Sequence, residues 1–323
     1  MRFKVGVIIL NYNNIDDTIN CIESVVENSD TDGLKFVVVD NGSSIHVVEA
    51  VRNYLKKRFL SYTEGGEVPG MKTLPQMTYL CLSENLGYAR GNNAGADLLY
   101  SDPEINQILI LNNDILFTSD IIPVLQKNLE ILPDAAIISP LLYKKDNTSV
   151  DYNCARNAAS LAQLFFANLF CGRNILGIRN RYLRKQYVLG TQPFQSGIIK
   201  IELPSGSCML VDKMLFQQIG SFDPHTFLYY EENILWAKVQ RLGLSNYIDT
   251  TVSCIHLGAA TTRTQKPNKF ISECSIQSLD YYLRNYTNAG WLYLSCMKLF
   301  YQITRLKIRL KTLYSSSKYM TKI

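Results

Sequence analysis

The sequence predicts an α/β protein built on a mostly parallel β-sheet with helices on both faces. Its 323 residues suit one main catalytic domain, and an apolar content of 47% is ample for a buried core. Short runs that are apolar almost throughout alternate with segments of helical spacing, which is typical of strands covered on both faces. Less regular segments in the second half predict that antiparallel strands complete the sheet.

The first 132 residues support this fold class element by element. Compact apolar runs predict strands at Lys4–Leu10, Lys35–Val39, Thr78–Leu82 and Gln107–Leu111. Apolar residues at helical spacing predict helices at Asp16–Asn28, His46–Phe59, Gly87–Tyr100 and Ser119–Leu132. Ser61–Gln76 is rich in Gly, Pro and Thr, so we expect a loop there that lengthens one crossover.

The second half mixes element types. Its patterns predict helices at Ala158–Phe170 and Glu231–Leu242, on either side of a basic stretch at Arg173–Lys185. They also predict strands at Ile198–Ile201, Cys208–Val211 and Thr251–His256.

Charge divides the chain into an acidic body and a basic tail. No acidic residue follows Asp280, whereas eight Lys or Arg do, so residues 1–280 carry a net charge of −3 and the tail +8. We therefore expect a catalytic domain at 1–275 and a basic amphipathic helical region at 276–323, and no binding of nucleic acid by the body. From Trp291 onward apolar and basic residues interleave, which is typical of a helix that lies on an anionic inner-leaflet membrane surface; packing on the domain or on a partner stays open.

The eight cysteines and the amino terminus predict a cytoplasmic protein. The cysteines contain no Cys-x-x-Cys pair and lie mostly in apolar runs, which is typical of reduced thiols rather than of a zinc site. The apolar run Val5–Leu10 is too short for a signal peptide or a membrane span.

Polar residues follow four of the predicted parallel strands. In open parallel sheets ligands bind at the carboxyl ends of the strands, so these segments are the first candidates for a site. Turn chemistry explains any one of them, but four at one sheet edge indicate a cleft for a ligand with hydroxyls and phosphates. The segments begin with Asn11, Asp40, Asn85 and Asn112.

Two groups of residues have the chemistry of a catalytic site. Asn112-x-Asp114 places two oxygen ligands on one face of an extended segment, which suits Mg²⁺ or Mn²⁺, and His256 is a candidate third ligand. Helix capping by the first pair and a structural role for the histidine remain alternatives. Glu231 and Glu232 open a helix after an aromatic run, so one of them is a candidate general base, although acidic residues also favour a helix amino terminus.

The joint order of these motifs resembles the family 2 glycosyltransferases of the GT-A fold, and is most similar to the rhamnosyltransferase-like branch. The resemblance covers roughly residues 3–260. It rests on the segments Val7–Asn13, Val37–Ser43, Asn85–Gly95, Leu111–Asp114, Gly220–Asp223 and Tyr230–Glu232.

The resemblance implies a role for each candidate residue. The donor nucleotide is expected at Asn11, Asp40, Asn85, Gly87, Asn92 and Asn113, and the metal at Asp114, Asn112 and His256. Glu232 matches the catalytic carboxylate, with Glu231 before it, and Leu203–Cys208 matches the segment that contacts donor sugar and acceptor. Two departures are Asn112 for the first metal-motif acid and Glu232 where Asp is usual, which leaves the base open between the two glutamates.

The implied function is metal-dependent hexosyl transfer with inversion, in the synthesis of a bacterial surface polysaccharide. The implied donor is a dTDP- or UDP-linked sugar, with rhamnose the first candidate, and the implied acceptor is a glycan or a polyprenyl-diphosphate-linked glycan. A dehydrogenase is disfavoured because Asn11 and its neighbours replace the glycine-rich turn after the first strand. A non-catalytic subunit that binds nucleotide sugars is the remaining alternative.

Overall fold

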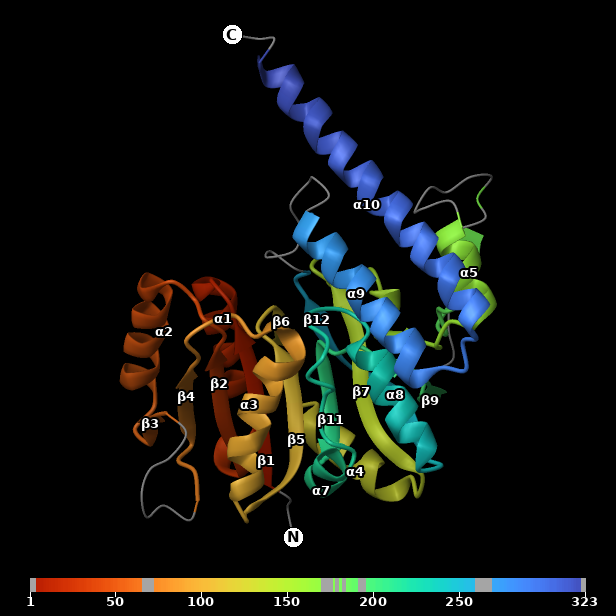
Figure 1. The fold of residues 1–323 in the computed structure, drawn as a ribbon. Helices are drawn as coiled ribbons and strands as arrows, with labels where there is room; N and C mark the ends of the chain where they lie inside the picture. Colours follow the sequence, from red (N-terminus) through yellow and green to blue (C-terminus); the bar gives the residue numbers. More distant parts are fainter. Residues whose placement is uncertain are drawn as a thin grey trace.

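Strands and helices alternate through the first 112 residues of the computed structural model, as the sequence predicts (Figure 1). The elements are β1 (Lys4–Asn11), α1 (Ile15–Asn28), β2 (Leu34–Asp40), α2 (Ile45–Arg58), β3 (Tyr62–Glu64), β4 (Met77–Cys81), α3 (Gly87–Ser101) and β5 (Ile105–Asn112). The structure describes residues 4–65, 73–169, 177, 180–181, 184–190, 196–258 and 269–320, with side chains to residue 310 in the last helix.

The remainder of the chain supplies shorter strands and most of the carboxyl-terminal helices. Its strands are β6 (Ile115–Phe117), β7 (Ala135–Lys144), β8 (Ala155–Arg156), β9 (Ile198–Ile201), β10 (Leu203–Pro204), β11 (Cys208–Asp212) and β12 (Ser245–His256). Its helices are α4 (Ile122–Ile131), α5 (Leu161–Leu169), α7 (Lys213–Gln218), α8 (Glu231–Arg241), α9 (Lys269–Tyr286) and α10 (Trp291–Met320). Single turns of 3₁₀ helix lie at Thr31–Gly33 and Tyr152–Cys154.

A ten-stranded sheet with the order β3-β4-β2-β1-β5-β11-β7-β12-β6 forms the centre of the domain, and β9 pairs with β12. The pairs β3–β4, β4–β2, β2–β1, β1–β5 and β7–β12 are parallel. Strand β11 is antiparallel to both β5 and β7, and β6 and β9 are antiparallel to β12. The prediction of a mostly parallel sheet completed by antiparallel strands is therefore confirmed.

Helices cover both faces of this sheet (Figure 1). On one face α1, α2 and α4 bury residues such as Ile22, Val51 and Leu125 in a cluster with alternate residues of β1. On the other face α3, α7 and α8 bury Leu99, Val239 and other apolar side chains against the remaining strand positions. Because both faces are covered, the central strands are apolar almost throughout, which is the pattern seen in the sequence.

Strand β7 was not predicted from the sequence, and neither were helix α7 and the short strands β3, β6, β8 and β10. Pro140 lies inside β7, and proline normally argues against a central strand because it lacks the N–H that the ladder needs. Here β12 shifts register between Asp249 and Ser253, opposite Pro140, so the ladder is already interrupted where the N–H is absent. Strand β12 accordingly begins at Ser245, six residues before the predicted strand.

Helix α4 begins at Ile122, three residues later than predicted. Pro123 lies in its first turn, where a missing N–H costs nothing, whereas a helix begun at Ser119 would place this proline further inside. Helix α5 likewise begins three residues after the predicted start. The predicted loop Ser61–Gln76 contains a short strand, β3, which pairs with β4. The rest of this loop lies partly outside the described residues, as does most of the basic stretch Arg173–Lys185.

The carboxyl-terminal helices form a third cluster with α5 and α8. Leu283 of α9 and Met297 of α10 are fully buried in it, beside Ile234 of α8. The expected division after residue 275 falls inside α9. Beyond this cluster α10 extends away from the domain (Figure 1). None of the described helices combines the length and the apolar content needed to cross a membrane.

Candidate active site

The first two polar segments meet at the carboxyl edge of the sheet. Asn11 ends β1 and donates a hydrogen bond from Nδ2 to Oδ2 of Asp40 at the end of β2, over 2.9 Å. The second oxygen of Asp40 accepts the backbone N–H of Ser43 at 2.8 Å, and Tyr79 donates to Oδ2 at 3.3 Å. Asp40 is fully buried, so these donors hold its carboxylate in one orientation.

A shared set of hydrogen bonds joins these residues to the end of β5. Oδ1 of Asn11 accepts the hydroxyl of Thr18 at 3.0 Å and lies 3.5 Å from Nδ2 of Asn113. The same amide of Asn113 donates to the Thr18 hydroxyl at 2.9 Å. The structure thus brings Asn11, Asp40 and Asn113 together, as the motif order predicts.

The third polar segment forms a wall beside this cluster. Asn41 donates to Oδ1 of Asn85 and to the carbonyl of Gly87, both at 3.1 Å, and accepts the backbone N–H of Leu86. Gly87 has φ of +82°, and a Cβ there would lie 2.3 Å from the carbonyl oxygen of Phe227, so only glycine fits. Asn92 lies one turn further along α3, buried, and donates to a carbonyl of its own helix.

The predicted metal ligands Asp114 and His256 converge. Nε2 of His256 lies 3.3 Å from Oδ2 of Asp114, and Nδ1 lies 2.9 Å from a carboxylate oxygen of Asp151. Burial opposes the charged form of the imidazole, but the two carboxylates outweigh it and raise the pKa of His256 to about 9. Asn112, the other member of the motif, contacts the hydroxyl of Ser207 at 3.4 Å.

This arrangement fits a divalent cation that also binds phosphate. A carboxylate held on Nδ1 leaves Nε2 of the histidine for a metal, which is the usual outer-shell arrangement of metal-binding histidines. Within the described residues, no three His, Cys, Asp or Glu side chains form a ready-made metal cluster. Asp114 and His256 would therefore share the cation with phosphate oxygens and water, as is common for Mg²⁺ in nucleotide sites.

The two glutamates at the start of α8 lie in different environments. Oε1 of Glu232 accepts the backbone N–H of Gly206 at 3.2 Å and lies 3.7 Å from the guanidinium of Arg156, and its side chain is 22% exposed. Glu231 is only 5% exposed; burial, and next the charge of Glu232, raise its pKa to about 8. Tyr229 and Tyr230, both with positive φ, form the tight turn that begins this helix.

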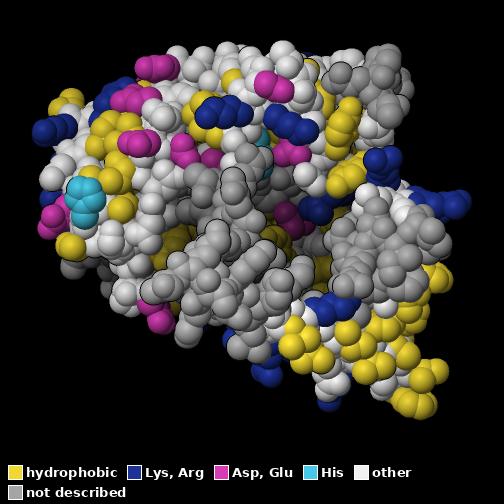
Figure 2. All heavy atoms as spheres, turned by 90° about the horizontal axis from the view of Figure 1, so that it is seen from above, with side chains coloured by type: hydrophobic (Ala, Val, Ile, Leu, Met, Phe, Trp, Pro, Cys, Tyr) yellow, Lys and Arg dark blue, Asp and Glu magenta, His cyan; other side chains and the backbone are white. Residues whose placement is uncertain are grey.

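A single loop connects the metal side to the glutamate side. Ser207 accepts the backbone N–H of Asn112 on its carbonyl at 2.8 Å, and its neighbour Gly206 donates to Glu232. The carbonyl of Gly206 in turn accepts the hydroxyl of Tyr88 at 2.6 Å. Figure 2 looks onto this edge of the sheet, where acidic and basic side chains gather around a hollow.

The sequence of residues 6–220 matches the family model of glycosyl transferase family 2. This segment is more than half of the chain. The chain is a family 2 glycosyltransferase.

Named relatives agree with this membership. This glycosyltransferase is 22% identical over 258 residues to the low-salt glycan biosynthesis hexosyltransferase Agl10 of Haloferax volcanii, covering 79% of this chain and 68% of that protein. Its fold is similar to that of the mannosyltransferase PcManGT from Pyrobaculum calidifontis in complex with GDP-Man and Mn²⁺ (TM-score 0.55, 14% identity, 98% of this chain, 76% of that one). It is also similar to GalNAc-T7 with UDP, GalNAc and Mn²⁺ (TM-score 0.57, 11% identity, 98% of this chain, 57% of that one). These likenesses show that the fold is of the GT-A type.

Four further residues that contact the candidate active site were not predicted from the sequence. Asp151 and Arg156 lie in an irregular segment far from their partners His256 and Glu232 along the chain, and no local pattern marks them. Thr18 and Tyr88 lie on α1 and α3, and the local sequence does not distinguish them from other residues of these helices. Only their contacts across the sheet edge reveal them.

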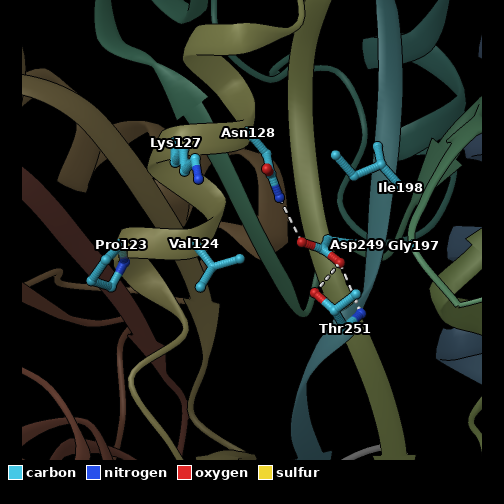
Figure 3. Close-up of a pocket in the computed structure, with 8 residues that line it drawn as sticks. All are labelled: Pro123, Val124, Lys127, Asn128, Gly197, Ile198, Asp249 and Thr251. Carbon is cyan, nitrogen blue, oxygen red and sulfur yellow. Dashed lines mark hydrogen bonds between the residues drawn. The ribbon is translucent and has the colours of Figure 1, made fainter.

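A second pocket, of about 600 Å³, lies between α4, β9 and β12 (Figure 3). Three of its polar residues bond to one another: Asn128 donates to Asp249, whose other oxygen accepts the N–H and hydroxyl of Thr251. Asp249 lies seven residues before the end of β12, away from the carboxyl edge of the sheet. None of the predicted site residues lines this pocket, so it is separate from the candidate active site.

Proposed function

We propose that this glycosyltransferase moves a hexosyl group from a nucleoside-diphosphate sugar to a hydroxyl of a growing glycan, with inversion at the anomeric carbon. The observation that carries the proposal is the loop of Gly206 and Ser207, which contacts Glu232 on one side and Asn112 of the metal motif on the other. A partly exposed carboxylate therefore lies close to the place where a diphosphate would leave. Glu231 is too deeply buried to meet an acceptor, which favours Glu232 as the base.

The chain's own groups suit a single displacement. The acceptor oxygen forms a bond to the anomeric carbon while the bond from that carbon to the diphosphate oxygen breaks. The acceptor proton passes to the carboxylate of Glu232. The N–H of Gly206 and the guanidinium of Arg156 orient this carboxylate from two sides. The hydrogen bond from Tyr88 to the carbonyl of Gly206 holds the residue that carries this N–H.

Mg²⁺ or Mn²⁺ is the cofactor that the residues fit best. Asp114, His256 and Asn112 would hold it, and when bound it would neutralise the departing diphosphate. The Mn²⁺ ions named in the two similar solved structures support this assignment.

The nucleotide is proposed to bind beside Asn11 and Asp40, with Asn85, Gly87 and Asn92 as the wall of its site and Asn113 linking it to the metal motif. One of the similar solved structures holds GDP-Man, and the other holds UDP with GalNAc. Donors of the dTDP-rhamnose and UDP-hexose types are the first to test. The proposed acceptor is a polyprenyl-diphosphate-linked glycan of a bacterial surface polysaccharide, assembled at the cytoplasmic face of the membrane.

The exposed face of α10 supports a membrane-bound acceptor. Five apolar side chains recur along this helix at intervals of three, four and seven residues and are 37–62% exposed: Leu292, Leu299, Ile303, Leu306 and Leu310. Lys298 and Arg309 are exposed beside them, and no acidic residue follows Asp280. Two copies of this helix would bring like charges together, so an anionic membrane is the proposed partner. Figure 2 shows hydrophobic side chains gathered beside Lys and Arg side chains on the side of the molecule where α10 lies.

Vesicle sedimentation tests the membrane proposal. Full-length protein should sediment with anionic vesicles at low salt and less with neutral ones, and Leu299→Gln with Leu306→Gln should abolish sedimentation. Ile45→Gln, which removes an equally exposed apolar side chain from α2, should have no effect. Absence of binding to anionic vesicles at low salt would contradict the proposal.

Transfer of labelled sugar tests the catalytic proposal. Protein with Mn²⁺ and a panel of labelled nucleotide sugars should release nucleoside diphosphate and label a glycan acceptor. Binding of a nucleotide sugar without turnover on any donor would instead assign the chain to a non-catalytic, nucleotide-sugar-binding subunit.

A further inference from the structure

A third pocket, of about 490 Å³, extends the site beyond the metal motif toward β7. It is lined by Lys144, Lys145, Asp146, Asp151, Asn153, His256, Leu257 and Gly258. Neither the motif comparison nor the family resemblance assigns a role to the two lysines. They lie where β7 ends, at the same edge of the sheet as Asp114.

The strand register places Lys144 directly beside the metal site. Strand β12 lies between β6 and β7 at this point, and His256 pairs with Ile115 on one side and with Lys144 on the other. Asp114 immediately precedes Ile115. His256 therefore lies in the sheet between Lys144 and the residue that follows Asp114.

The carboxylates in this pocket are already engaged. Asp151 contacts Nδ1 of His256. Asp146 accepts the backbone N–H groups of Thr148 and Ser149 in its own turn, and these bonds lower its pKa to about 2. Among the described residues, no carboxylate lies within ion-pair distance of Lys144 or Lys145. The pocket thus presents two ammonium groups that a mobile anion can approach.

We infer that Lys144 and Lys145 bind the nucleoside diphosphate from the pocket beside His256. This inference rests on the proposed function. A nucleoside diphosphate that shares a cation with Asp114 and His256 would lie next to this pocket. It carries more negative charge than one divalent cation neutralises. Lysines at the rim supply the remaining positive charge to the leaving group as compact, flexible cations.

The binding of UDP, dTDP and GDP in the presence of Mn²⁺, measured by calorimetry beside the matching nucleosides, tests the inference. Lys144→Met with Lys145→Met should weaken binding of the diphosphate about tenfold, since two exposed ion pairs contribute this much together. Nucleoside affinity should not change. The loss should be smaller at high salt, and the double arginine variant should keep wild-type affinity.

Lys57→Met with Lys200→Met is the matched control, because it removes the same charge from exposed sites. Lys200 pairs with Asp134 at the other end of β7. Equal diphosphate affinity in the Lys144/Lys145 variant and the wild type would overturn the inference, as would an equal loss for nucleosides. Wild-type binding of diphosphate without sugar transfer would overturn the catalytic proposal alone, and no binding of any probe would overturn both.

Discussion

Oε1 of Glu232 accepts a hydrogen bond from the backbone N–H of Gly206, 26 residues earlier in the chain. A Cβ on Gly206 would lie 2.7 Å from the hydroxyl oxygen of Tyr88 and 3.3 Å from Glu232 itself. The close approach of three elements at this glycine sets where the carboxylate points.

Replacing Glu232 by Gln should lower kcat by about 10²–10⁴-fold, the usual contribution of a general base. The amide oxygen can still accept the N–H of Gly206, so the fold and the affinity for the donor should not change. Steady-state kinetics and calorimetric binding of the nucleoside diphosphate measure the two effects. A variant that turns over at the wild-type rate would remove Glu232 from the role of base.

Replacing Glu231 by Gln should instead change the pH dependence of stability. The pKa of Glu231 is raised by burial, so between its ordinary value of 4.5 and about 8 the folded state binds one proton more than the unfolded state. Stability of the wild type should therefore fall with rising pH in this window, by about 1.4 kcal/mol per pH unit relative to the glutamine variant. Urea unfolding at pH 5 to 9 measures the difference. Parallel profiles for the two proteins would show that Glu231 is ionised in the folded state.

Tyr88→Phe should lower kcat with little change in donor affinity. The variant loses the hydroxyl that holds the carbonyl of Gly206 at 2.6 Å, so the same residue's N–H, in the preceding peptide, is less well fixed against Glu232. A loss of about 1 kcal/mol of positioning corresponds to roughly fivefold in rate. Tyr100→Phe, which removes a hydroxyl from the other end of α3, is the control. An equal loss in both variants would indicate a general effect on the helix.

Asp151→Asn should weaken Mn²⁺ binding by about 10–100-fold in the presence of nucleoside diphosphate, as loss of an outer-shell carboxylate usually does. Asp151 orients His256 from the side opposite Asp114. Asp146→Asn, in the neighbouring turn, should bind Mn²⁺ like the wild type, because an amide oxygen can also accept its two backbone N–H groups. Titration followed by electron paramagnetic resonance measures free Mn²⁺. Unchanged affinity for Asp151→Asn would show that His256 is oriented without it.

Gly87→Ala should destabilise the fold by several kcal/mol, since the new Cβ meets the carbonyl of Phe227 and φ is positive. Gly65 has a similar φ of +83° but nothing within 4 Å of the Cβ position. Gly65→Ala should therefore lower the free energy of unfolding by only about 1 kcal/mol, the cost of the backbone conformation. Urea unfolding measures the loss of stability in each of the two variants. Equal losses would mean that the contact with Phe227 relaxes at no cost.

The order of the elements and the place of the polar motifs followed from local pattern. Asn11, Asp40 and Asn112 each come directly after an apolar run, and Asn85 follows another by three residues. The carboxyl ends of parallel strands must lie at one edge. Strand β7 could not be predicted in this way, because Pro140 is tolerated only through a bulge in a strand more than 100 residues later.

The sequence by itself determined the fold class, the family and the residue types at the sheet edge, since these depend on periodicity and on motif order along the chain. Only the tertiary structure distinguished Glu232 from Glu231 and brought Asp151, Arg156 and Lys144 to the site. Burial and contact across strands depend on which distant segments pack together, and adjacent residues at the start of one helix point to different surroundings. That is why two neighbouring glutamates of the same chemistry are expected to differ in function.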